Sequence, residues 1–412
     1  MRIYLISSAV AALLGCSYLY FNSPNSAQNS KSFLQHISDE DHEVTNAFIL
    51  FTAKYGRSYA SKTHAQTKFA TFKQNYDKIQ IHNQKAGKSY KLGINQFSDM
   101  SEEEWLEIYG REQPSSKKLL KTEWWDDQGP YDEKGRYVCR HDEEMHNYFD
   151  YNDYAYIDDT LTHCTSADWV KHGKVGTPKQ QSTCGSCWAH STIASVETLH
   201  AQIHDIKHSD NVTSFSEQQL VDCNFLPNLG CLGGKRQYSF DYVSKEGLTT
   251  AEKYPYQNKQ GECLYESSTD MVFKIDGFKA WERPTVEDVE KLACQGTVSV
   301  SMRINDCIKN YAGGIIWDGD ENATCGCSNV GGTNHAVAIV GFGTDHTAEG
   351  PCSKYWLIKN SWGTEWGEGG FFRLCREDMH MPEGMCNVRS EPMIAMKEAK
   401  RKKEEEEGTD ND

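Results

Sequence analysis

The chain has 412 residues, of which 38% are hydrophobic and 25% are charged, with a formal net charge of −16. This composition is typical of a folded, soluble protein long enough for two or three domains. The acidic excess argues against a nucleic-acid partner, because it leaves no basic face to bind phosphate. The 15 cysteines and the sequons at Asn211 and Asn322 instead indicate an oxidising, secretory compartment.

The first 22 residues are expected to be a targeting segment. Met1 and Arg2 supply a short positive start, and residues 3–21 are apolar enough for a signal peptide. We expect this segment to be cleaved. The alternative is an uncleaved anchor, because the apolar run is nearly long enough to span a bilayer; a membrane would be a partner only in that case.

Residues 41–110 are polar with apolar residues at helical spacing, which predicts a small helical domain. The spacing of Phe72, Asn75, Ile79 and Asn83 resembles the second half of the helical signature of papain-family propeptides. His64 and Lys68 depart from its first half, where that family has Glu and Arg. The segment from Gly93 to Asp99 is similar to the second propeptide motif, and Trp105 follows in an acidic context. The resemblance implies an inhibitory pro-domain.

Residues 111–162 match no part of that family. They are acidic and rich in Trp and Tyr, and they contain Cys139. We expect an exposed linker that is cut during activation. The alternative is that the aromatic residues occupy part of a substrate groove, since they are costly to leave wholly in water.

Residues 163–395 form the expected main domain, beginning near Ala167-Asp-Trp169. Helical patterns dominate to about residue 276, with Ser216 as a helix cap, and strand patterns follow from about residue 277. The fold class is therefore expected to be α+β. Residues 396–412, a basic block followed by an acidic one, are expected to be a charged tail.

The segment from Gln181 to Trp188 contains Cys184-Gly-Ser-Cys187, just before a long apolar-periodic run. Cys187 would lie in the first turn of a helix, whose partial positive charge stabilises a thiolate. Cys-Gly-Ser-Cys-Trp resembles the papain-like cysteine proteases, as do His335, about 150 residues downstream, and Asn360, about 170 downstream. That family implies a helical half and a β-barrel-like half, with the active-site cleft between them.

The resemblance also implies the role of each residue. Cys187 is the expected nucleophile, His335 its ion-pair partner and general acid, and Asn360 the group that orients His335. Gln181 is the expected oxyanion donor beside the backbone N–H of Cys187. Trp362 would shield the His335–Asn360 bond. Ser182 and His190 depart from the family, which has Gly and an aromatic residue there.

The family pattern implies three disulfide pairs: Cys184 with Cys231, Cys223 with Cys263, and Cys386 with Cys325 or Cys327. The partners of the remaining six cysteines stay open, since six allow 15 connectivities. They are Cys164, Cys294, Cys307, Cys352, Cys375 and one of the 325/327 pair.

Two rival classes use the same residues. A thiol-disulfide oxidoreductase would use Cys184 and Cys187, but the βαβ pattern typical of that class is missing here. A non-catalytic homologue would keep the fold alone, against which the intact Cys187, His335 and Asn360 argue. A zinc site at Cys325 and Cys327 has a poor spacing, and neither a metal nor another cofactor is expected.

We therefore expect a monomeric cysteine endopeptidase zymogen, secreted or in a lysosome or vacuole, whose pro-domain inhibits it and leaves at acidic pH. Proteins or peptides would be its substrates. The family implies a substrate-binding groove at Gly233, Gly234, Lys235, Arg236, Thr333, Ala336 and Glu391. We expect Glu391 at the floor of the second subsite, tolerating a basic side chain, with Lys235 and Arg236 directed to solvent.

Overall fold

The computed structural model describes residues 42–85, 89–110, 164–226, 228–281, 284–317, 327, 332–377 and 382–397. The expected signal segment, the linker at 111–162 and residues 398–412 lie outside these residues. The described chain forms two compact units. One contains residues 42–85 and 92–104, and the other contains residues 89–91 and everything from Trp105 onward. No helix in these stretches is long and apolar enough to cross a membrane.

The first unit is built on two helices, α3 (His42–Lys54) and α4 (Lys62–Gln84). Their apolar faces meet through aromatic rings: the Phe72 ring lies 5.1 Å from Phe48 and 5.0 Å from Phe51, centroid to centroid. All three side chains are buried, which gives this small unit its own apolar core. The expectation of a helical segment here is confirmed.

Asparagines on α4 hold the loop that follows it. Asn75 Nδ2 donates to the carbonyl oxygens of Ser98 and Met100 at 2.9 and 3.0 Å. The Asn83 side chain makes two hydrogen bonds to the backbone of Leu92, at 2.8 and 3.0 Å. The two propeptide-like motifs are therefore joined in the structure, because side-chain amides of α4 bond to backbone groups of the following segment that would otherwise be unpaired.

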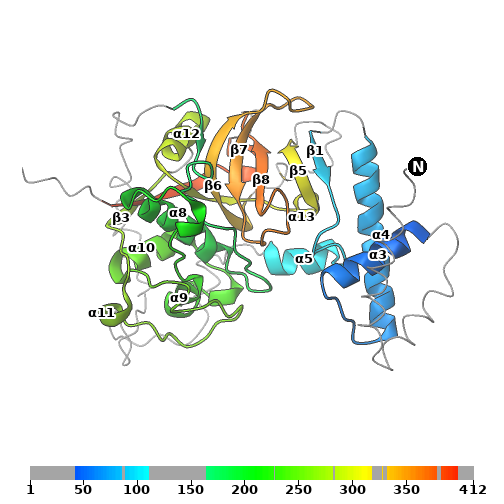
Figure 1. The fold of residues 1–412 in the computed structure, drawn as a ribbon, viewed down its shortest axis with the longest axis horizontal. Helices are drawn as coiled ribbons and strands as arrows, with labels where there is room; N and C mark the ends of the chain where they lie inside the picture. Colours follow the sequence, from blue (N-terminus) through cyan, green and yellow to red (C-terminus); the bar gives the residue numbers. More distant parts are fainter. Residues whose placement is uncertain are drawn as a thin grey trace, which may run out of the picture. The chain divides into compact units, whose positions relative to one another are not determined.

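The helical part of the second unit surrounds α8 (Cys187–Ile203). Most side chains of α8 are buried, so it is the central helix of an apolar cluster that includes Trp188, Phe240 and Leu248. The other helices of this part are α9 (Glu217–Cys223), α10 (Arg236–Glu246) and α11 (Ser267–Asp270), of which α9 and α10 contact α8 (Figure 1). As expected, Ser216 caps α9, since its Oγ accepts from the backbone N–H of Gln219 at 3.0 Å.

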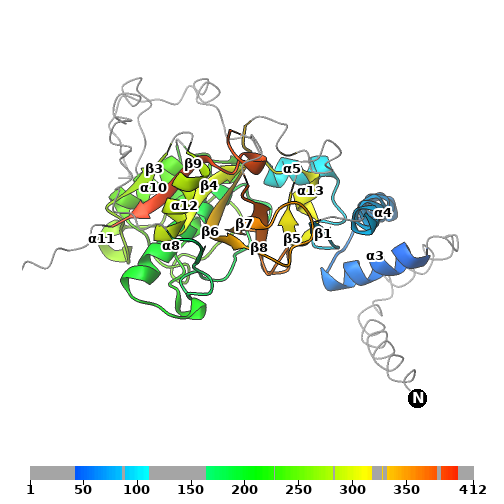
Figure 2. The ribbon, with the colours of Figure 1, turned by 90° about the horizontal axis from the view of Figure 1, so that it is seen from above.

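The strands of the second unit form one mixed sheet in the order β1-β5-β8-β7-β6-β4-β9-β3, with β2 also paired to β6 (Figures 1 and 2). The strands are β1 (Tyr90–Leu92), β2 (Ala167–Asp168), β3 (Gly277–Ala280), β4 (Val298–Met302), β5 (Tyr311–Ile316), β6 (His335–Thr344), β7 (Lys354–Lys359), β8 (Phe371–Cys375) and β9 (Ser390–Met396). Two more helices, α12 (Val286–Gln295) and α13 (Asp306–Lys309), lie between strands in the chain. The α+β expectation is confirmed.

The expectation of a β-barrel-like half is wrong in one respect, because the sheet is not closed. Its path ends at β1 on one side and at β3 on the other, and the described strands contain no ladder joining these two. Closure needs a continuous hydrogen-bonded ladder around the whole ring. Here both end strands are short, and register shifts interrupt the β6–β7 and β4–β9 pairings.

Disulfides tie the loops of the second unit together. Cys184 pairs with Cys231 and Cys223 with Cys263, as the family resemblance implied. Of the two partners left open for Cys386, the structure selects Cys327. It also pairs Cys164 with Cys294 and Cys352 with Cys375, and Cys307 is disulfide-bonded as well.

Candidate active site

Cys187 is the first residue of α8, directly after a tight loop. The loop approaches Cys231 closely: a Cβ added at Gly185 would lie 2.6 Å from the Cys231 carbonyl oxygen. Cys187 is the one free cysteine among the described residues, and it is half-buried. Because Cys184 is bonded to Cys231, the Cys184–Cys187 disulfide of an oxidoreductase is not formed.

His335 opens β6, and Asn360 follows the end of β7, the neighbouring strand. His335 Nε2 and Asn360 Oδ1 lie 2.9 Å apart in a hydrogen bond. The indole of Trp362 covers this pair, with its centroid 5.0 Å from the imidazole ring, and is fully buried. The pair is therefore kept away from water, as the sequence predicted.

Burial acts on both the thiol and the imidazole. Burial raises the pKa of Cys187, against hydrogen bonds from the backbone of Ala336 and Trp188 and the positive charge of Arg236. Burial also lowers the pKa of His335 to about 4, against the hydrogen bond to Asn360. Burial thus favours a neutral thiol and a neutral imidazole over the thiolate and imidazolium expected from the sequence.

Part of the burial comes from the end of the propeptide-like segment. Helix α5 (Glu102–Tyr109) enters the second unit at Trp105. The rings of Trp105 and Tyr109 pack edge-on against Trp362, at centroid distances of 5.3 and 5.6 Å. These aromatic side chains therefore lie over the residue that covers the His335–Asn360 pair.

Gln181 is fully buried, and both ends of its amide are engaged. Its Nε2 donates to the Cys184 carbonyl oxygen at 3.0 Å, and its Oε1 accepts from Ser361 Oγ at 2.6 Å. The amide is thus held on the loop leading to Cys187, with its donor turned to that loop. The next residue, Ser182, has φ of +52°, in the left-handed region that favours glycine. The departure from glycine at this position therefore carries backbone strain.

His190 replaces the family's aromatic residue and still packs as one. Its ring lies edge-on to Tyr256 at a centroid distance of 5.2 Å, and its Nδ1 lies 3.0 Å from the Ser186 carbonyl oxygen. Tyr256 in turn donates to the Gln181 carbonyl oxygen at 2.9 Å. Burial lowers the pKa of His190, which favours its neutral form, and the ring fills the space of an apolar one.

A buried ionic cluster behind the site was missed by sequence reasoning. Lys179 Nζ lies 2.8 Å from Glu197 and 2.6 Å from Glu217, and Lys359 lies 3.7 Å from Glu197. Since Lys359 directly precedes Asn360, the cluster fixes the loop that carries Asn360 against α8 and α9. The one available signal was Glu197, which is the single Asp, Glu, Lys or Arg in the helical run 187–203.

The predicted substrate-binding residues are spread over three loops and strand ends. Gly233 has φ of +120°, and a Cβ on Gly234 would lie 2.8 Å from the Trp188 ring, so both positions need glycine. Lys235 and Thr333 are half-buried, and Ala336 is buried.

One expectation about this group is wrong. Arg236, expected in solvent, is 2% exposed, whereas the Glu391 side chain, expected at a pocket floor, is 72% exposed. The reason is that Arg236 finds buried oxygen acceptors on β4 and β9, which the sequence did not reveal.

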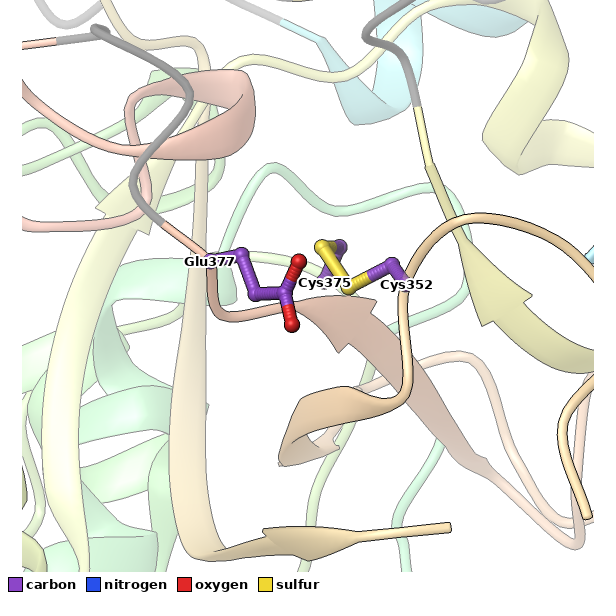
Figure 3. Close-up of side chains that lie close together, drawn as sticks. All are labelled: Cys352, Cys375 and Glu377. Carbon is purple, nitrogen blue, oxygen red and sulfur yellow. A yellow bond between two sulfur atoms is a disulfide. The ribbon is translucent and has the colours of Figure 1, made fainter. Parts of the chain in front are cut away.

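The cluster of Cys352, Cys375 and Glu377 brings enough potential ligand atoms together to suggest a metal site. Figure 3 shows, however, that its two sulfur atoms are joined in a disulfide. Disulfide sulfur is not the thiolate that binds zinc. Cys327, half of the poorly spaced Cys325–Cys327 pair, is likewise bonded to Cys386.

Comparison with known proteins agrees with this geometry. Residues 163–396 match the papain family cysteine protease domain, and residues 48–105 match the cathepsin propeptide inhibitor domain. The cysteine protease XCP2 of Arabidopsis thaliana is 33% identical over 354 residues, which cover 85% of each chain. Falcipain-3 of Plasmodium falciparum is 31% identical, over 92% of this chain and 71% of its own.

Solved structures of proforms are similar to this chain over most of its length. Digestive procathepsin L 3 from the larval midgut of Tenebrio molitor has a TM-score of 0.66 and 27% identity, covering 86% of this chain and 99% of its own. A recombinant stem bromelain precursor has a TM-score of 0.66 and 26% identity, covering 87% and 100%. The chain therefore belongs to the papain family of cysteine proteases and, with its propeptide inhibitor domain, is a zymogen of that family.

Proposed function

We propose that this protease is an endopeptidase in which Cys187, His335 and Asn360 act as a catalytic triad. The Cys187 thiol passes its proton to His335, and the resulting thiolate attacks the carbonyl carbon of the scissile peptide bond. His335 then gives that proton to the leaving amine, which leaves an acyl thioester on Cys187. Water, deprotonated by His335, attacks the thioester, releases the carboxylic acid product and restores the thiol.

The observation that carries this proposal is the buried hydrogen bond of 2.9 Å between His335 and Asn360, beneath Trp362. It fixes the plane of the imidazole and leaves Nδ1 for the reaction. The backbone of Ala336, the residue after His335, hydrogen-bonds to Cys187, which places the thiol at the same point of β6. We propose Gln181 as the oxyanion donor, which requires its Nε2 to turn from Cys184 toward the substrate.

The test is the Cys187→Ala variant beside the wild type, both brought to acidic pH as full-length proforms. We expect the wild type to hydrolyse an unfolded protein substrate after processing. The variant should lose essentially all of this activity, even when it is processed by a trace of wild-type enzyme that is then inhibited. Full hydrolysis by the variant would show that another residue is the nucleophile.

We further propose that residues 41–110 are the pro-domain, residues 111–162 a linker cut on activation, and residues 163–395 the mature enzyme, a monomer. The disulfides of the second unit support an oxidising compartment on the secretory route, whether vacuole, lysosome or extracellular space. Asn211 is exposed on a short 3₁₀ helix (Ser209–Asn211) and is suited to glycosylation. Peptides would bind along Gly233, Gly234, Lys235, Thr333 and Ala336.

A further inference from the structure

Arg236 is a buried cation without a role in the proposed reaction steps. It is the first residue of α10 and is 2% exposed. Its guanidinium donates to the Ser299 carbonyl oxygen at 2.7 Å, to Ser301 Oγ at 3.1 Å and to the Glu391 carbonyl oxygen at 2.8 Å. All three acceptors are neutral, so they satisfy its N–H groups without cancelling its charge.

The carboxylate near Arg236 neutralises its charge only in part. Glu391 Oε2 lies 3.9 Å from Arg236 Nη2, and the Glu391 side chain is 72% exposed, so water screens its charge. The lysines of the buried ionic cluster differ in this respect. Lys179 and Lys359 face two buried carboxylates, those of Glu197 and Glu217. Arg236 therefore carries a buried positive charge that a buried acid does not balance.

Two residues, Ser301 and Ala336, connect this charge to the reactive thiol. Arg236 Nε bonds to Ser301, and Ser301 lies directly opposite Ala336 in the β4–β6 ladder. The backbone of Ala336 in turn hydrogen-bonds to Cys187. The positive charge of Arg236 lowers the pKa of the Cys187 thiol, in opposition to burial. Burial lowers the pKa of Arg236 itself to about 10, so the guanidinium stays charged in acidic and neutral solution.

Other titratable groups around Cys187 do not supply the same charge. His335 on β6 changes charge in the reaction itself, and burial lowers the pKa of His190 on α8, which disfavours its charged form. Burial raises the pKa of Tyr256, whose hydroxyl lies 2.6 Å from Oγ of Ser186, the residue before Cys187, so this hydroxyl is neutral. The cluster of Lys179, Lys359, Glu197 and Glu217, behind His190, is balanced in charge.

We propose that Arg236 is a positioning residue for the peptidase reaction. Its buried and unbalanced positive charge stabilises the thiolate of Cys187 across Ser301 and Ala336, the two residues that connect them. The proposal rests on Cys187 being the nucleophile. It assigns Arg236 a role in the charge state of the thiol and replaces the sequence-based picture of a solvent-facing arginine.

The test is the pH dependence of iodoacetamide alkylation of Cys187 in full-length protein after acid processing, completed by a trace of wild-type enzyme where needed. Arg236→Met removes the charge, Arg236→Gln removes it but keeps an amide donor for the Ser299 carbonyl, and Arg236→Lys keeps it. Lys245→Met, at the other end of α10, removes an exposed cation as a matched control. Thermal unfolding confirms that each variant is folded.

We expect the thiolate titration of both neutral variants to move up by about one pH unit, so that alkylation below the titration midpoint is about tenfold slower. Arg236→Lys and Lys245→Met should match the wild type. A folded neutral variant with the wild-type pH profile of alkylation would overturn the proposal. Alkylation of Arg236→Lys as slow as that of Arg236→Met would also overturn it, since the loss of hydrogen bonds would then explain the slower rate.

If neither neutral variant folds, Glu391→Gln decides, because that side chain is exposed and its removal takes away the partial counter-charge. Alkylation at acidic pH should become about twofold faster; no increase would overturn the proposal. If the wild type is active and is labelled at Cys187, but the variants keep the wild-type alkylation profile, only the inference about Arg236 is defeated. A wild type that hydrolyses no peptide, or does so with Cys187 fully alkylated, defeats the proposed function.

Discussion

Ser182 shows how a single residue can store strain at the site. It has φ of +52°, where a side chain costs about 1 kcal/mol relative to glycine. It lies between Gln181, the proposed oxyanion donor, and the disulfide-bonded Cys184. The sequence showed the departure from the family's glycine, and the structure gives its physical consequence.

We predict that Ser182→Gly stabilises the protein by about 0.3 kcal/mol, because the relief of strain slightly exceeds the entropy that a glycine adds to the unfolded chain. For a domain of this size, that change raises the melting temperature by about 1 °C. Differential scanning calorimetry of the proform measures it. Thr183→Gly, at the next residue, lacks this strain and should give no rise. A lower melting temperature for Ser182→Gly would contradict the account.

At the scale of elements, the buried ionic cluster connects the loop of Lys179 to α8, α9 and the end of β7. Burial alone would raise the pKa of Glu197, but the charges of Lys179 and Lys359 outweigh it and hold that pKa below its usual value. Because the folded-state pKa is lowered, the stabilisation from Glu197 is present above the usual carboxyl pKa. It is lost only as the pH falls through the lowered value. The cluster therefore keeps its contribution to stability in mild acid.

We predict that Glu197→Gln destabilises the second unit by about 3 kcal/mol, because it leaves the part-buried Lys179 and the buried Lys359 facing one carboxylate. The melting temperature at neutral pH should fall clearly. The double variant Glu197→Gln with Lys359→Met restores the charge balance and should recover part of the loss. A single variant as stable as the wild type would show that the cluster contributes nothing net.

Lys68 on α4 and Glu104 on α5 form a second pH-dependent pair, within the first unit. Lys68 Nζ lies 2.8 Å from Glu104, so the lysine keeps the cation where the family has arginine. Burial acts to raise the pKa of Glu104, but the hydrogen bonds from Lys68 and Ser101 lower it overall. The stabilisation from this pair is thus present above the usual carboxyl pKa and is lost as the pH falls through the lowered value.

We predict that Glu104→Gln lets the proform convert to mature enzyme at a higher pH than the wild type, because the first unit is already weakened in mild acid. The pair is partly exposed, so the effect on stability is about 0.5 kcal/mol. Conversion rates measured over a pH series should differ in mild acid and converge in strong acid. Glu102→Gln, on the same helix, is the control. A shift toward lower pH would contradict this role.

At the scale of the whole molecule, local motifs predicted much of the site. Cys187, His335 and Asn360 each stand in a short, specific context, and the structure joins His335 to Asn360 as expected. The order of helices before strands was also readable, since periodicity changes near residue 277. These features depend on neighbours in sequence, which a reading of the chain can use.

What the sequence could not provide depends on tertiary neighbours. The burial of Arg236 requires acceptors from β4 and β9, far away in the chain. The partners of Cys164 and Cys352 depend on which loops the sheet brings together, and the open edges of that sheet depend on strand register. Each of these is set by packing between distant segments, for which local patterns carry little signal.

The central claim is that Cys187 is the nucleophile of a peptidase, and active-site labelling tests it most directly. Acid-processed wild-type protein is titrated with iodoacetamide while peptide hydrolysis is measured, and the label is located by peptide mapping. We predict that activity falls in proportion to labelling and reaches zero at one label per molecule, located on Cys187. Full activity with Cys187 completely labelled would contradict the account.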